Sequence, residues 1–273
     1  MKKLYFLALL LPGLIGCSEY EEKSFKNAPE TISPVKLSDQ KKVADRDDSL
    51  PLPAVNNANR MPAKTSVSSG QQPMKNHQML NVVQINQNPE LKYGCEITST
   101  AMMLSYAGVK TNKMQLFYSV KKDPDPLIKS RNGDIIRWGD PDVGFVGDMT
   151  GRRAGYAVFD KPMVDLVNRY LPGRAVNLTN RPFDEVLLHV SKGYPVVVWT
   201  TGDFRLPDRW ESWSHGRQTI RTPLDLHAVV LVGYDRHFVY INDPLSGRKQ
   251  LRIEKNRFIA SWKALKSRAV SYH

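Results

Sequence analysis

The sequence predicts an α+β fold over residues 79 to 273, which we expect to form one domain. Two observations support this prediction. Apolar residues recur at helical spacing in the first half of the segment, whereas the second half contains runs of β-branched and aromatic residues typical of strands. A helical first half followed by a strand-rich second half favours the α+β class.

The predicted elements begin with a strand at residues 79–85, MLNVVQI. Three helices follow, at residues 96–107, 161–170 and 182–191; Gly108 and Gly193 end the first and the third, and Pro162 lies at the start of the second. Then the period changes, and the remaining segments are predicted to be strands: residues 195–201, 227–234, 238–243 and 249–254.

The N-terminal 17 residues, MKKLYFLALLLPGLIGC, have the pattern of a bacterial lipoprotein signal peptide. A lysine pair precedes a short apolar run, and the end of that run resembles a lipobox, which implies cleavage before Cys17 and lipid attachment, including palmitate, to its thiol. An uncleaved anchor helix and an ordinary secretory signal are the alternatives. We expect a protein that is lipid-anchored to the cell membrane on the extracytoplasmic face, in the cell envelope.

Residues 18 to 78 are rich in charged and small polar residues and contain few aromatics, so this segment cannot bury a core. We expect a disordered polar tether. No other segment approaches the ~20 apolar residues that a membrane-spanning helix requires. The net charge of +12 favours attraction to anionic polymers or lipid head groups, but charge alone does not identify a partner, and a generally basic solvated surface explains it better. No segment resembles a nucleic-acid-binding module, and we expect a monomer.

Cys95 is the candidate nucleophile, because Cys17 is expected to carry lipid and leaves Cys95 without a disulfide partner. Cys95 lies at the start of a predicted helix, where the helix dipole and an imidazolium partner would lower the thiol pKa. His227 is the candidate base and Asp243 the residue that orients it. Gln87 and the backbone N–H of Cys95 could bind a developing oxyanion.

Several stretches together resemble the stand-alone bacterial domains related to bacteriocin-leader peptidases, family thirty-nine of the papain-like cysteine peptidases. These stretches are QNPELKYGCEITSTAMMLSYAG, GFVGDMTGRRAGYAVFDKP, GYPVVVWTT, LHAVVLVGYD and VYINDPLSG. The resemblance covers residues 79 to 273. It implies a papain-like fold, in which an N-terminal helix carrying Cys95 packs on an antiparallel sheet carrying His227 and Asp243. It also implies that Gln87 belongs to the oxyanion hole.

The sequence departs from that family in two respects. Leader peptidases are usually fused to a membrane transporter with an ATP-binding cassette, and the sequence shows neither part, so bacteriocin maturation with coupled export is not expected. Met149 also stands where the related domains have proline, which leaves the shape of this loop open.

Each candidate residue has an alternative interpretation. Cys95 could be an inert buried thiol, His227 a core histidine, and Asp243 a turn residue before proline. Gln84 is an alternative to Gln87. Asp148 and Trp199 are candidate cleft residues, although a turn aspartate and a strand-end aromatic explain them equally well. The histidines lack metal-ligand spacing, so we expect neither a metal nor another cofactor.

The predicted function is that of a cysteine hydrolase that cleaves peptide or isopeptide bonds through a thioester acyl-enzyme. The expected substrates are peptides, proteins or the peptides of peptidoglycan. An acyl transferase using the same acyl-enzyme is a close variant. A catalytically silent module that binds an envelope peptide or protein is the alternative from another class.

A geometric prediction concerns the hairpin that joins His227 to Asp243. Their side chains can meet only if the strand register places both on one face of the sheet. A three-residue loop of residues 234 to 236, which would pair Gly233 with His237, satisfies this condition, as does a bulge with the same effect. A two-residue loop of residues 235 and 236 alone would separate the two side chains. We also expect the Cys95 sulfur within about 4 Å of an imidazole nitrogen.

Overall fold

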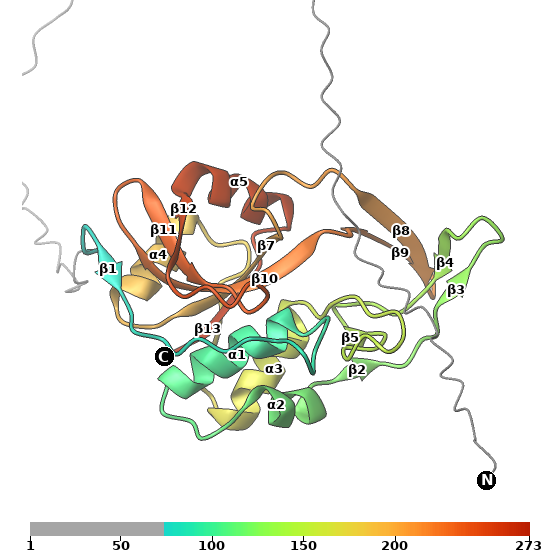
Figure 1. Ribbon diagram of the computed structural model, residues 1–273, viewed down its shortest axis with the longest axis horizontal. Coiled ribbons are helices and arrows are strands. Elements are labelled where there is room, and N and C mark those ends of the chain that lie inside the picture. Colours follow the sequence, from blue (N-terminus) through green and yellow to red (C-terminus); the bar gives the residue numbers. More distant parts are fainter. Residues whose placement is uncertain (1–73) are drawn as a thin grey trace, which may run out of the picture. The chain divides into compact units, whose positions relative to one another are not determined.

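The computed structural model describes residues 74–273, which contain five helices and thirteen strands (Figure 1). The predicted signal peptide, Cys17 and most of the predicted tether lie outside the described residues. Residues 75 to 78, which were assigned to the tether, contact the domain instead. Lys75 N donates to Ser191 Oγ, and the Tyr234 hydroxyl donates to Lys75 O. This part of the tether prediction was wrong, because main-chain groups of the segment are bound to the folded domain.

The main sheet has seven strands and is antiparallel throughout, with the order β12-β11-β10-β7-β13-β6 and with β1 paired to β10. Its long strand β10 contacts three partners and carries His227. The strands are β1 (Gln78–Met79), β6 (Ala175–Asn177), β7 (Val196–Thr201), β10 (Leu226–Tyr234), β11 (Phe238–Asn242), β12 (Leu251–Glu254) and β13 (Ala269–Tyr272).

Helices pack on both faces of the sheet, because side chains of a strand alternate between its two faces. Val197 lies in a core cluster with α1 and α3, whereas its neighbours Val196 and Val198 lie in a cluster with α4 and α5. The helices are α1 (Cys95–Tyr106), α2 (Lys113–Ser119), α3 (Asp160–Tyr170), α4 (Phe183–Ser191) and α5 (Lys255–Ala264). The three predicted helices are confirmed as α1, α3 and α4, while α2 and α5 were not predicted.

Two small sheets lie beside the main one (Figure 1). Strand β2 (Lys122–Asp123) pairs in parallel with β5 (Phe145–Val146), and a four-stranded sheet joins β3 (Ile128–Lys129), β4 (Ile135–Arg137), β8 (Trp210–His215) and β9 (Gln218–Pro223). Trp138 and Trp213 form a third apolar cluster with Val146. None of these strands was predicted, because their sequences are short or largely polar.

The predicted strand at residues 79–85 is wrong beyond Met79. Leu80 N still donates to Val232 O, but the chain then leaves the β10 edge. The Asn242 side-chain amide donates to Val82 O and Val83 O, and Ile85 N contacts the Met102 sulfur of α1. Alternating apolar residues therefore anchor this segment between α1 and the sheet without a ladder of strand hydrogen bonds.

Among residues 74–273, no helix combines the length and the apolar character needed to cross a membrane.

Candidate active site

Cys95 is the first residue of α1 and is buried, with 7 % of the residue exposed. Gly94 permits a close backbone approach here, since a Cβ on it would lie 2.4 Å from the Leu91 Cβ. The Cys95 thiol donates to Glu96 Oε2 over 3.3 Å. Ser99 of the same helix donates its hydroxyl to Ala228 O over 3.2 Å, and Ala228 directly follows His227 on β10. The start of α1 therefore lies against the part of β10 that carries His227.

His227 and Asp243 form a buried pair. His227 Nε2 lies 2.8 Å from Asp243 Oδ1, which leaves Nδ1 as the ring nitrogen available to a thiol. Leu245 N also donates to Oδ1, and the Ser246 hydroxyl donates to Oδ2 over 2.6 Å. Burial disfavours the charged carboxylate of Asp243, but His227, Ser246 and the Leu245 amide outweigh burial and lower the pKa of Asp243 to about 2. Asp243 is thus an ionised partner for the imidazole.

A bulge in β10 brings the two side chains to one face of the sheet. Tyr234 pairs with Val239 and Gly233 with Tyr240, but Val230 pairs with Asn242, so the register shifts by one residue between Leu231 and Gly233. Continued without this shift, the ladder would place His227 and Asp243 on opposite faces. The shift restores the common face.

The loop prediction was therefore half right. The bulge is confirmed, but the pairing of Gly233 with His237 is wrong. Asp235 N donates to Phe238 O, which leaves a two-residue loop of Arg236 and His237. Asp235 Oδ1 accepts the backbone N–H groups of His237 and Phe238, and these bonds select the shorter loop.

The two candidate glutamines have different surroundings. Gln84 Nε2 donates to Asp243 O and to Ile85 O, so both of its amide hydrogens are engaged. Gln87 Nε2 donates to Lys92 O over 2.8 Å, which holds the amide beside the segment leading into Cys95 and leaves its second hydrogen for a ligand. Gln87 thus retains a donor suited to an oxyanion, whereas Gln84 braces the backbone of Asp243.

The family follows from this sequence and fold. The model of the Peptidase_C39-like family matches residues 79–270. The chain belongs to this family. The resemblance seen in the sequence is confirmed, and membership indicates a cysteine-peptidase-like function.

Two similar proteins show how far the similarity extends. The uncharacterized protein YvpB of Bacillus subtilis (strain 168) is 35 % identical over 193 residues, which make up 70 % of this chain and 74 % of YvpB. A Bacillus anthracis crystal structure, described as a candidate C39-like peptidase, matches with a TM-score of 0.65 and 36 % identity. The match covers 73 % of this chain and 98 % of that one. The papain-like α+β fold predicted from the sequence is thereby confirmed.

Glu96 is a site residue that the sequence argument did not select. It is 0 % exposed, its Oε2 accepts the Cys95 thiol, and its Oε1 accepts the Val158 backbone N–H over 3.1 Å. The sequence did place an acidic residue in the first turn of a helix, but such residues are common there because they complement the helix dipole. The buried contacts of Glu96 could not be predicted from its position in the helix.

The expected lowering of the Cys95 pKa is not what the structure favours. Burial and the negative charge of Glu96 raise the pKa of the thiol well above its usual value, although the Ala228 backbone acts in the opposite direction. The dipole of α1 alone would lower the pKa of Cys95, but the adjacent carboxylate of Glu96 acts in the opposite direction. Burial and Glu96 together therefore favour the neutral form of the Cys95 thiol.

Trp199 does not line a cleft. Its side chain is 0 % exposed, packs in the main core, and donates its indole N–H to Val158 O over 3.0 Å. The cleft prediction for Trp199 was wrong because the strand end is covered by the segment that precedes α3.

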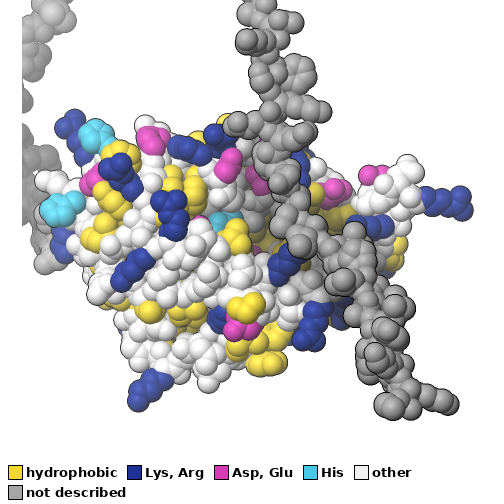
Figure 2. Space-filling view, in the orientation of Figure 1, with side chains coloured by type: hydrophobic (Ala, Val, Ile, Leu, Met, Phe, Trp, Pro, Cys, Tyr) yellow, Lys and Arg dark blue, Asp and Glu magenta, His cyan; other side chains and the backbone are white. Residues whose placement is uncertain are grey.

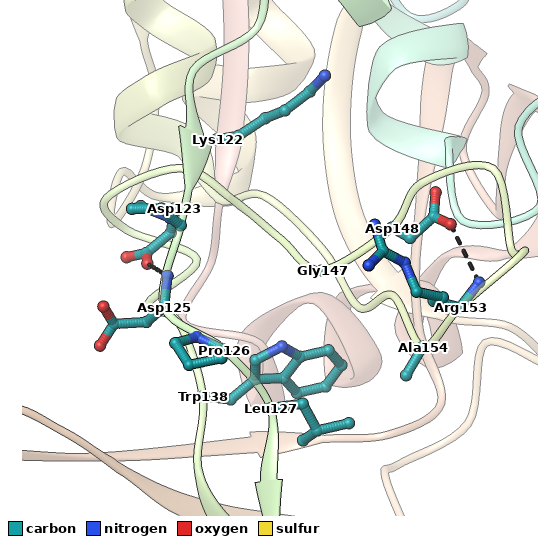
Figure 3. Close-up of a pocket in the computed structure, with 11 residues that line it drawn as sticks. Lys122, Asp123, Asp125, Pro126, Leu127, Trp138, Gly147, Asp148, Arg153 and Ala154 are labelled. Carbon is teal, nitrogen blue, oxygen red and sulfur yellow. Dashed lines mark hydrogen bonds between the residues drawn. The ribbon is translucent and has the colours of Figure 1, made fainter.

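Asp148 lies at the rim of a pocket of about 540 Å³, opposite Asp123 and Asp125, with Trp138 between the two sides (Figure 3). Its carboxylate accepts the backbone N–H groups of Thr150 and Arg153, as the turn interpretation requires. This candidate cleft residue therefore reaches a pocket, but its oxygens are bound within its own loop.

The loop of residues 147–155 also contacts the segment before the nucleophile. Tyr93 N donates to Met149 O, and a Cβ on Gly155 would lie 2.7 Å from the Tyr93 ring. Met149, at the position where the resemblance implied a proline, is 1 % exposed and packs in the main core. The substitution thus gives a loop anchored both by its backbone and by its side chain.

Three side chains, Asp123, Asp125 and His215, are close enough together to hold a metal ion. They come from distant segments, so sequence spacing could not identify them. His215 Nε2 lies 3.1 Å from Asp123 Oδ2, while Arg137 pairs with Asp125 and the Asp140 amide donates to Asp123. These protein partners account for the cluster, and the donor set does not require a resident metal.

Proposed function

We propose that the protein is a membrane-tethered, extracytoplasmic cysteine hydrolase that cleaves peptide or isopeptide bonds, with Cys95, His227 and Asp243 as its catalytic triad. The buried 2.8 Å hydrogen bond between His227 Nε2 and Asp243 Oδ1 carries this proposal, because such a bond fixes the ring and its tautomer. The hydrogen bond that Ser99 of α1 donates to Ala228 O supports the same assignment, since it joins the helix that begins at Cys95 to the residue next to His227.

Each residue has a defined role in the proposed reaction. His227 Nδ1 takes the thiol proton, and the Cys95 sulfur attacks the carbonyl carbon of the scissile bond. The oxyanion receives hydrogen bonds from Gln87 Nε2 and from the Cys95 backbone N–H, one of the N–H groups that the first turn of a helix leaves unpaired. His227 then gives its proton to the departing amine, which leaves a thioester on Cys95.

The second half of the reaction decides between hydrolase and transferase. In hydrolysis, His227 removes a proton from water, the resulting hydroxide attacks the thioester, and the thiol leaves with a proton from His227. In acyl transfer, an amine replaces water. Both outcomes use the same residues.

The location of the protein is proposed from the sequence alone. A lipid on Cys17 would hold the domain at the outer face of a cell membrane, where peptidoglycan peptides and exported proteins are available substrates. Lys and Arg side chains are scattered over the face shown in Figure 2 rather than gathered in one patch, which is consistent with a generally basic solvated surface.

A silent binding module is the second candidate, and the raised pKa of Cys95 favours it. A thiol kept neutral by burial and by Glu96 is a poor nucleophile at neutral pH. In this alternative, the domain would bind an envelope peptide without cleaving it.

The deciding experiment incubates the full chain, purified in detergent, with a panel of peptidoglycan peptides and exported-protein peptides, and follows the products by mass spectrometry. We expect cleavage by the wild type, none by Cys95→Ala, and strongly reduced cleavage by Asp243→Asn. Added amines would give adducts if the protein is a transferase. Binding without cleavage by the wild type would support the silent module, and cleavage by Cys95→Ala would exclude the triad.

A further inference from the structure

Glu96 holds a buried carboxylate in contact with the candidate nucleophile. Both of its oxygens have partners: Oε1 accepts the Val158 N–H, and Oε2 accepts the Cys95 thiol. The Val158 carbonyl is itself fixed, because it accepts the Trp199 indole N–H. The carboxylate is therefore held against the sulfur by a rigid part of the core.

The ionisable groups around Glu96 come from four parts of the chain. Cys95 precedes it on α1, and Tyr156 lies on the segment before α3, where the charge of Glu96 contributes to a raised pKa of this phenol after the larger effect of burial. Arg268, which precedes β13, acts on Tyr156 in the opposite direction. His227 lies on β10 next to Ala228, which contacts Cys95. Neither Arg268 nor His227 forms an ion pair with Glu96 among the described residues.

We propose that Cys95 and Glu96 share one proton, so that the Glu96 carboxylate keeps the nucleophile in its neutral thiol form until that proton moves. Transfer along the hydrogen bond converts the Cys95 thiol and the Glu96 carboxylate into a Cys95 thiolate and a Glu96 carboxylic acid, without loss of a proton to solvent. This role deepens the proposed function, since it rests on Cys95 being the nucleophile. Glu96 then restrains the thiol and also provides it with a second proton acceptor besides His227.

The pH dependence of such a pair differs from that of an isolated thiol. Burial raises the pKa of Glu96 to about 7, despite hydrogen bonds that act in the opposite direction. Below this pH both groups are protonated, and the form with a Cys95 thiolate beside a protonated Glu96 grows tenfold with each pH unit. Above it, the pair holds one proton, and the fraction in this form stays constant.

The first test measures alkylation of Cys95 by iodoacetamide in the full chain, for the wild type, Glu96→Gln and Glu185→Gln. Glutamine at position 96 can still accept the Val158 N–H, but it removes the negative charge beside the sulfur. Glu185 is an acid on α4 that is well exposed and paired with Arg181, so it provides a matched control for the same chemical change.

We expect Glu96→Gln to react faster at pH 7.5, by about fourfold for each unit by which the thiol pKa falls, because the tenfold gain in thiolate is partly offset by lower nucleophilicity. Glu185→Gln should react like the wild type. An unchanged or slower rate in Glu96→Gln would overturn the proposal, provided that circular dichroism shows a folded protein.

The second test needs only the wild type and holds even if Glu96→Gln does not fold. The logarithm of its alkylation rate should rise with pH up to about 7 and then rise less steeply, as expected for a shared proton. A single steep rise through this region would show that Cys95 titrates independently of Glu96. Neither test requires peptide cleavage, so the failure of the hydrolase proposal and the failure of the shared proton give different results.

Discussion

The Ser246 hydroxyl donates a 2.6 Å hydrogen bond to Oδ2 of Asp243, the carboxylate oxygen that His227 does not use. A hydrogen bond to a charged group is worth about 1.5–3 kcal/mol. Ser246 therefore helps Asp243 to hold the His227 imidazole in place, although Ser246 lies in the turn beyond β11.

Removal of this hydroxyl should weaken the triad without removing any of its members. For Ser246→Ala we expect a cleavage rate lower by about tenfold, because the Asp243 pKa rises and the His227 ring is held less firmly. Ser246→Thr, which keeps the hydroxyl, serves as the control. Equal rates for all three proteins would show that Asp243 does not depend on Ser246.

The pH dependence of stability should reveal the ionised state of Asp243. Its pKa is lowered to about 2 in the folded protein, so its stabilising effect is present above the unfolded pKa of about 4 and is lost as pH falls towards 2. The difference in free energy of unfolding between the wild type and Asp243→Asn should therefore shrink by about 2 kcal/mol between pH 4 and pH 2. Urea unfolding at several pH values measures it, and a difference independent of pH would contradict it.

Variants of Gln84 and Gln87 should differ in kinetic experiments. Gln87→Ala is expected to lower kcat by about 100-fold for peptide cleavage, since it removes an oxyanion donor. It should not change alkylation of Cys95, a reaction that forms no oxyanion. Gln84→Ala should also impair cleavage, because it removes the hydrogen bond that Gln84 donates to the Asp243 backbone carbonyl. The kcat values of the two variants therefore compare Gln87 with the alternative candidate, Gln84. A larger loss of kcat in Gln84→Ala than in Gln87→Ala would reverse the assignment.

Gly233 is predicted to be essential for the attachment of β1. A Cβ at this position would lie 2.6 Å from Gln78 O, so Gly233→Ala must separate β1 from β10. We expect a loss of about 1–3 kcal/mol in the free energy of unfolding. Gly202→Ala is the control, since its Cβ would lie 4.0 Å from the nearest atom. Similar stability of the two variants in urea would argue against a tight β1–β10 contact.

Processing at Cys17 tests the predicted anchor. The wild-type protein should partition into detergent and begin at a lipid-modified Cys17, whereas Cys17→Ser should remain unprocessed. Intact-mass measurement of both proteins checks this expectation. A wild-type chain recovered from the aqueous phase without lipid would rule out the anchor.

The sequence predicted those parts of the fold in which local pattern and burial agree. The helix that begins at Cys95 and strands β7, β10 and β11 have long, strongly apolar stretches, so their type could be read directly. Residues 79–85 have the alternation of apolar and polar residues that is typical of a strand, yet two of their carbonyl groups accept hydrogen bonds from the Asn242 side chain instead of from a neighbouring strand. Strands β8 and β9 are stabilised by contacts between distant tryptophans, which no local pattern records.

The candidate site was predictable to the extent that its residues lie in family motifs. His227 and Asp243 were found in this way, and the hydrogen bond between them agrees with the expectation. The ionisation of Cys95 was not predictable, because it depends on how deeply Glu96 is buried and on what its second oxygen binds. The cleft prediction for Trp199 failed for a similar reason, since the residues that bury its side chain come from the segment before α3 rather than from its own strand.

The bulge between Leu231 and Gly233 also limits how the chain can vary in length. His227 and Asp243 lie 16 residues apart, and inserting or deleting one residue within the paired part of β10 or β11 would turn one of the two side chains to the other face. Related chains that keep both side chains in contact should therefore differ within these paired strands by two residues, or by one residue together with gain or loss of a bulge, whereas the loop between the strands can vary in length. A longer recognition loop can therefore be grafted at Arg236 and His237 with any number of added residues, provided that the lengths of the two paired strands and the bulge are kept.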